Sequence, residues 1–73
     1  MDDRVTRYMQ ALEEEIDGDE RFADELAGLA GHLRRAGYNE LAPFMAACGC
    51  HLRVKAVELQ GRLAAVRHQD DAS

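Results

Sequence analysis

Two cysteines and a histidine lie within four residues in the middle of the chain, in the stretch FMAACGCHLRVK (residues 44–55). On a helix, Cys48 and Cys50 point to nearly opposite sides, so one ion could bind both only if the helix unwound at Gly49. Cys48 and His51 are three residues apart and share one helical face. Sulfur and imidazole nitrogen are ligands suited to zinc or iron, so this pair is the first candidate metal or redox site.

A complete metal site needs more ligands than this pair. Glu25 and His32 are seven residues apart on one stripe of the preceding helical segment, and they are the further candidate ligands. In a two-fold dimer, two copies of Cys48 and His51 would also supply the four donor atoms of a tetrahedral site. The alternative is structural, because free cysteine packs like a small hydrophobic residue. That alternative requires no cofactor.

The rest of the sequence has no pattern typical of an enzyme. Thr6 falls in a first helical turn and Ser73 is the last residue, so neither is placed as a nucleophile would be. There is also no glycine-rich phosphate loop. We therefore expect a protein without catalytic activity.

Charge and hydropathy bear on the kind of partner. With 14 acidic residues against 9 Lys and Arg, the formal charge of -5 repels phosphate backbones, so nucleic acid is not expected as a partner. No apolar run reaches the roughly 18 residues that span a bilayer. The first ten residues, MDDRVTRYMQ, lack the pattern of a secretory signal. We expect a cytoplasmic protein that does not act at a membrane.

The elements that must position the candidate residues are helices, because helix-forming Ala, Leu, Glu and Arg dominate and no β-type alternation is present. One seam advances by alternating steps of four and three, as in a helix packed along its length: Val5, Met9, Leu12, Ile16, Asp19, Ala23, Leu26, Ala30 and Leu33. We predict a first helix over residues 3–35. A break at residues 17–19 stays open as an alternative, because Gly18 costs about 1 kcal/mol in a helix interior.

The segment RRAGYNE (residues 34–40) predicts the turn between two helices. Gly37 suits a left-handed helix cap, and Asn39 suits the cap of the next helix. Pro43 then falls in a first helical turn, where its missing N–H costs little. We predict the turn at residues 36–39, a second helix over 40–67 and a frayed tail over 68–73.

The second helix has a seam of its own, which runs through Leu41, Met45, Cys48, Leu52, Lys55, Leu59, Arg62 or Leu63, and Val66. Antiparallel folding about the turn would pair Leu26 with Cys48 and Asp19 with Lys55. The acid of one seam thus meets the lysine of the other, and we interpret this pair as an ion pair that fixes the alignment of the helices. The predicted fold is all-α, a single antiparallel helical hairpin over residues 1–73.

A hairpin of this size cannot cover its own apolar surface. The second helix carries a further stripe away from its seam, composed of small and β-branched residues: Cys50, Val54, Val57, Gly61 and Ala64. We predict that this stripe is an interface and that two hairpins form a homodimeric four-helix bundle. In an alternative, the same stripe docks on a larger protein partner.

Residues 22–63 resemble the helical hairpin of ferritin-like and rubrerythrin-like proteins, in the LA repeats, the AGYNELAPFM turn and the histidine followed by KAVEL. The resemblance implies a Glu-x-x-His pair on the second helix and a carboxylate on the first, which bind a di-iron centre within four helices. His51 matches the histidine, and Cys48 stands where that family has glutamate. Glu25 or Asp24 would supply the carboxylate.

Two functional hypotheses follow. The first is a non-enzymatic, self-associating interaction or accessory subunit without a cofactor. The second is a metal-binding or redox protein of ferritin-like type, with iron or zinc at Cys48 and His51.

Overall fold

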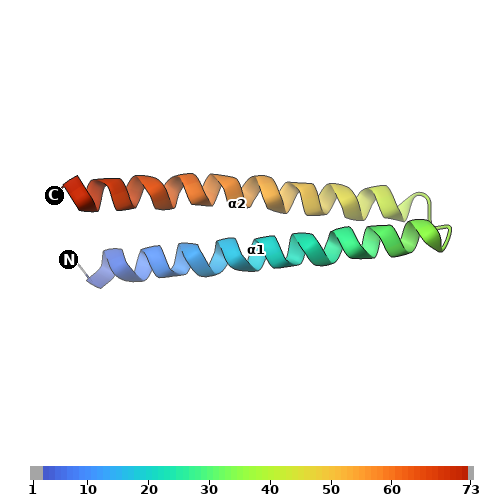
Figure 1. Ribbon diagram of the computed structural model, residues 1–73, viewed down its shortest axis with the longest axis horizontal. Helices are drawn as coiled ribbons and strands as arrows, with labels where there is room; N and C mark the ends of the chain where they lie inside the picture. The colour runs from blue at the N-terminus through green and yellow to red at the C-terminus, as the bar shows by residue number, and fades with distance from the viewer. Residues whose placement is uncertain (1–2, 73) are drawn as a thin grey trace.

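The computed structural model describes residues 3–72, which form two antiparallel helices (Figure 1). Helix α1 spans Asp3–Arg35 and helix α2 spans Leu41–Ala72. They lie side by side along a rod 55 Å long and 15 by 11 Å across, with the turn at one end. No strand occurs among the described residues. The predicted all-α antiparallel hairpin is confirmed.

Helix α1 is continuous through Gly18, so the break considered at residues 17–19 does not occur. Arg21 pairs with Asp17 at 3.2 Å across this segment, one helical turn apart. The cost of one glycine, about 1 kcal/mol, is small beside the packing of a helix that contacts its neighbour along its whole length. Over the described residues, neither helix has a segment long and apolar enough to cross a membrane.

The turn closes α1 with a Schellman motif. The N–H of Tyr38 donates to the carbonyl of Leu33 at 2.9 Å, and the N–H of Gly37 donates to the carbonyl of Arg34 at 3.2 Å. Gly37 has φ of 91°, a conformation that is strained for residues with a Cβ atom. The predicted left-handed cap is confirmed. At the start of α2, the N–H of Ala42 donates to the carbonyl of Tyr38 at 3.1 Å. The sequence had suggested Asn39 as the cap of this helix.

The ends of α2 differ from the prediction. The helix begins at Leu41, one residue later than expected, and Pro43 lies in its first turn as predicted. It continues to Ala72, so the expected helix end at residue 67 and frayed tail over 68–72 were wrong. The helix continues because it still has a neighbour: Gln69 adjoins Val5 of α1. Residue 73 lies outside the described residues.

The two seams were predicted with different success. All nine predicted seam positions of α1 are buried or half-buried. In α2 the row Met45, Leu52, Leu59 and Val66 also faces α1. The other row is shifted by one residue at three positions, because Ala42, Gly49 and Ala56 are buried rather than Leu41, Cys48 and Lys55. At its last position, Leu63 of the two predicted alternatives is the buried one. A Cβ added at Gly49 would lie 3.6 Å from the Cβ of Leu26, so Leu26 packs against Gly49, and the predicted partner Cys48 lines the same groove as Leu26.

The core differs between the two halves of the rod. Toward the open end, the packing is made by larger side chains: Met9, Leu12, Ile16, Leu59 and Leu63, together with Ala56. Toward the turn, the buried residues are Ala23, Ala30, Ala42 and Gly49. A Cβ on Gly49 would lie 3.3 Å from the carbonyl oxygen of Ala23, so the helix backbones approach each other closely here. The turn half therefore has a thin core.

The continuous helix and the left-handed cap predict opposite effects of two alanine substitutions. Gly18→Ala should raise the free energy of unfolding by about 1 kcal/mol, because the new Cβ meets no atom within 4 Å and alanine is the better helix former. Gly37→Ala should lower it by about 1 kcal/mol, because the cap keeps its positive φ. Urea denaturation followed by circular dichroism, at one protein concentration, measures both. Changes of the same sign would contradict this description.

Candidate interaction surfaces

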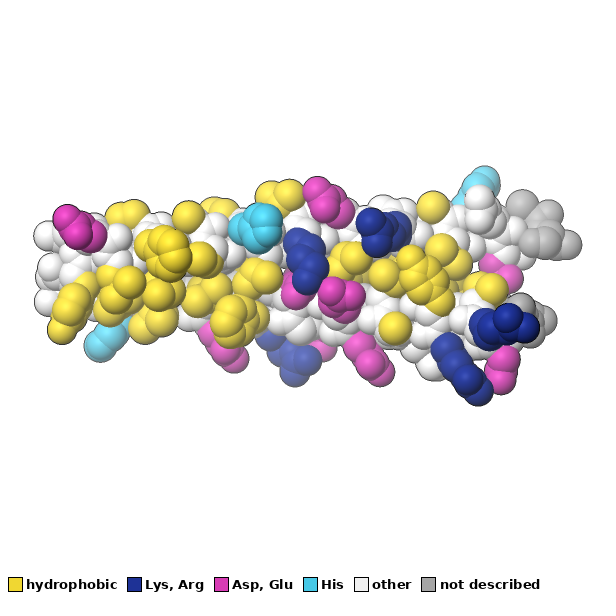
Figure 2. Space-filling model, turned by 180° about the vertical axis from the view of Figure 1, so that it is seen from behind, with side chains coloured by type: hydrophobic (Ala, Val, Ile, Leu, Met, Phe, Trp, Pro, Cys, Tyr) yellow, Lys and Arg dark blue, Asp and Glu magenta, His cyan; other side chains and the backbone are white. Residues whose placement is uncertain are grey.

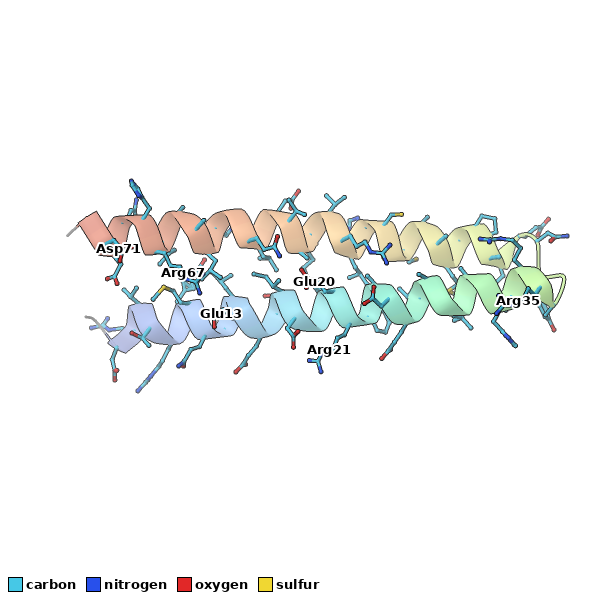
Figure 3. The ribbon with its side chains drawn as sticks, in the orientation of Figure 1. Glu13, Glu20, Arg21, Arg35, Arg67 and Asp71 are labelled. Carbon is cyan, nitrogen blue, oxygen red and sulfur yellow. The ribbon has the colours of Figure 1, made fainter. Side chains whose placement is uncertain are left out.

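The seam between the two helices is bordered by one flank on each side, and one of these flanks is polar. Three side-chain pairs join α1 to α2 along this polar flank: Glu13 with Arg67, Glu20 with Gln60 at 2.9 Å, and Asp24 with Arg53 at 3.2 Å. Arg53, Gln60 and Arg67 recur every seven residues, so they lie on one side of α2. Figure 3 shows Glu13 and Arg67 directed toward one another between the helices, whereas Arg21 points away from α2.

The opposite flank is apolar in the half near the turn. Its large side chains remain exposed: Phe22 by 52%, Phe44 by 61%, and Leu29 and Leu41 by 42% each. Together with Cys48 and His51 they form what we call the apolar flank. Figure 2 shows hydrophobic side chains gathered mainly over the turn half of one face, where an acidic group lies at the end, and Lys and Arg side chains at the middle and the open end. These exposed apolar side chains lie on one flank of a small chain, with Glu25 beside Phe22 at its border. Exposed apolar clusters are typical of interaction sites.

A shallow groove opens on the apolar flank between the helices. Its volume is about 400 Å³, and it is lined by Phe22, Leu26, Ala47, Cys48, His51 and Leu52. The sequence analysis did not predict that the large apolar residues of this flank form an exposed surface, and it placed Leu41 in the seam. Their seven-residue recurrence, with Leu29 after Phe22 and Cys48 after Leu41, was the available signal.

The structure brings together only part of the predicted metal site. Cys48 and His51 line the same groove, as their spacing predicted. Glu25 and His32 do not line it, and both are exposed. Asp24, the other candidate carboxylate, pairs with Arg53 on the polar flank. Within residues 3–72, no three His, Cys, Asp or Glu side chains are grouped so that they could hold a metal ion. The pair would need ligands from another chain.

The predicted interface stripe on α2 is uncovered in the hairpin. Cys50, Val54, Val57, Gly61 and Ala64 are all exposed, with Val54 at 57% and Val57 at 65%. Residues 41–52 contain no Asp, Glu, Lys or Arg. The turn half of α2 therefore presents apolar residues on both the stripe and the apolar flank.

The predicted contact between Asp19 and Lys55 is present. The Nζ of Lys55 lies 3.4 Å from Oδ2 of Asp19 and 3.1 Å from Oε1 of Glu15, a partner that the sequence argument missed. The Asp19 side chain is only 14% exposed, whereas Lys55 lies at the edge of the seam with 43% exposure. The hydrogen bond to Glu15 and the charge of Asp19 raise the pKa of Lys55 above its ordinary value of 10.5.

Comparison with known proteins gives no further guide, since no family model, no curated protein and no solved structure matches this chain. Its function is therefore inferred from its own surfaces.

The raised pKa of Lys55 predicts a loss of stability at alkaline pH. The folded state holds the Lys55 proton more tightly than the unfolded state, so the stabilisation is complete below about pH 10.5 and is lost as pH rises through the higher folded value. Lys55→Arg should reduce this loss, because guanidinium stays protonated there. Urea midpoints of both proteins from about pH 8 to about pH 12 measure the difference. Parallel curves would contradict the assignment.

Proposed function

We propose that this chain is a non-enzymatic helical protein that self-associates into a dimer, forms a four-helix bundle and serves as an interaction or accessory subunit. The observation that carries the proposal is the apolar flank, where Phe22, Leu29, Leu41 and Phe44 are each more than two fifths exposed. Exposing large side chains costs hydrophobic free energy that a partner surface would recover.

The small core of the hairpin supports the same proposal. Its large buried side chains are Leu12, Ile16, Leu59 and Leu63, all in the half near the open end. No large side chain among the described residues is less than 2% exposed. Isolated domains of this size are marginally stable and usually need a disulfide, a metal or a partner. Both cysteines are free thiols, which fits the reducing cytoplasm that we propose as its location.

Sedimentation equilibrium of the full chain at micromolar concentration tests the proposal, and we expect a dimer. Phe44→Glu on the apolar flank should weaken association at least about tenfold, because a charge would be buried there. Val57→Glu places the same charge on the exposed stripe of α2 and serves as the matched control, which we expect to remain dimeric.

Loss of the dimer with Val57→Glu alone would move the interface to the stripe. A wild-type chain that is a well-folded monomer at these concentrations would refute self-association.

A metal-binding or redox role is the second candidate, and the position of Cys48 and His51 in one groove favours it. Two copies of this pair could bind zinc or iron if α2 of one hairpin faced α2 of the other. The ferritin-like resemblance belongs to this hypothesis. It predicts bound metal in protein purified without a histidine tag, and loss of that metal with Cys48→Ala or His51→Ala. Absence of metal, with unchanged melting of both variants, would end it.

A further inference from the structure

We infer that a second copy of the chain packs on the apolar flank about a two-fold axis parallel to the helices, with both turns at the same end of the bundle. In this arrangement α1 of each hairpin lies against α2 of the other. The inference rests on the proposed self-association and adds the face and the orientation.

The apolar flank lies on the turn half of two rows of side chains, one on each helix, which border the seam and continue to the open end. From the turn toward the open end, α1 presents Leu29, Phe22, Glu15 and Tyr8, and α2 presents Leu41, Cys48, Lys55 and Arg62. The two rows are level with each other, because Phe22 and Cys48 line one groove and Glu15 contacts Lys55 at 3.1 Å. The flank is thus apolar near the turn on both helices and carries opposite charges at its middle.

A two-fold axis parallel to the helices leaves each residue at the same distance from the turn end, which we call its level. It places the α1 row of one hairpin against the α2 row of the partner. Phe22 then faces the partner's Cys48, so apolar side chains meet apolar side chains. Glu15 faces the partner's Lys55, so opposite charges meet. Tyr8 faces the partner's Arg62, a pairing of an aromatic ring with a guanidinium group. The flank is self-complementary in this orientation.

An axis perpendicular to the helices places α1 on α1 with the order of levels reversed. If the overlap is centred between Phe22 and Leu29, these two residues meet, but only the turn halves overlap and the charges of Glu15 and Lys55 find no opposite charge on the partner. The two centres with a longer overlap match poorly. If the overlap is centred at Phe22, Leu29 meets the partner's Glu15, so an apolar side chain faces a carboxylate. If it is centred at the ion pair, Glu15 meets its own copy and Lys55 meets its own copy. Like charges that face each other across an interface oppose association.

The area of the face that carries the apolar flank suits a second copy. The whole face that contains both helices, of which the apolar flank is the turn half, is 55 Å long and 15 Å wide, or roughly 800 Å². This is about the area that each partner contributes to a standard protein interface. The polar flank offers no equal surface, since its side chains are already paired between the helices.

Distances between spin labels test the arrangement directly. Asn39→Cys places one label at the turn, in a background of Cys48→Val and Cys50→Ala that keeps apolar side chains at both sites. With turns at the same end, pulsed dipolar spectroscopy should give a label-to-label distance on the order of 20 Å, since packed helices are about 8–10 Å apart. With turns at opposite ends, the distance should be on the order of 50 Å, the length of the hairpin.

A mixed sample provides the matched control. Chains labelled at Asn39→Cys, mixed with chains labelled at Asp71→Cys, should give a distance of roughly 50 Å between the labels of the two chains. The reverse result, a long turn-to-turn distance and a short mixed distance, would overturn the inferred orientation while leaving self-association intact. Absence of dipolar coupling, with a monomeric mass for both background and wild type, would overturn the proposed function as well. If the wild type dimerises but the chain with Cys48→Val and Cys50→Ala does not, Cys48 is kept. The spin label is then attached at position 39 through an unnatural amino acid in place of Asn39.

Discussion

The close approach of the two helices near Gly49 determines most of what is distinctive in this hairpin. A Cβ at this position would lie 3.3 Å from the carbonyl oxygen of Ala23, so the backbones leave little room between them. The seam on the turn side is accordingly lined with Ala23, Ala30 and Ala42. The half-buried Leu26, Leu33, Met45 and Leu52 share this part of the seam. Phe22, Leu29, Leu41 and Phe44 lie outside it on the apolar flank. The packing that joins the helices thus leaves hydrophobic surface for a partner.

The polar pairs between the helices determine which side of the hairpin is left for a partner. Ion pairs between exposed groups, such as Asp24 with Arg53, are each worth at most about 1 kcal/mol, so they contribute little to stability. They nevertheless satisfy the charged groups along one flank and leave that flank hydrated. On the other flank, Lys55 draws Glu15 and Asp19 together at the middle, and the surface on the turn side of this cluster is apolar.

The sequence predicts the α1 seam completely and the α2 seam only in part, for a reason that lies in side-chain size. In α1 the nine seam positions carry mostly larger apolar residues, so their spacing is visible in the sequence. In α2 three of the four positions in one row are Ala42, Gly49 and Ala56, and the larger neighbours one residue earlier conceal them. The shared face of Cys48 and His51 follows from helical spacing, whereas the groove they line depends on how closely the helices pack. The length of α2 was underestimated because contacts with α1 are not visible in local propensity.

Two separate contacts explain why the helices adopt this register rather than one shifted by a heptad. A shift that brings Cys48 to the place of Lys55 leaves Asp19, which is largely buried, without a cation. The opposite shift brings Arg62 there and keeps a positive charge, but it moves Ala56 into the place of Gly49, against the Ala23 carbonyl. The first shift therefore loses both contacts, because it also brings Ala42 to the place of Gly49, and the second shift loses one. A largely buried carboxylate adds little stability by itself, so we propose that Asp19 serves to align the helices, which in turn would set the order of side chains on the apolar flank.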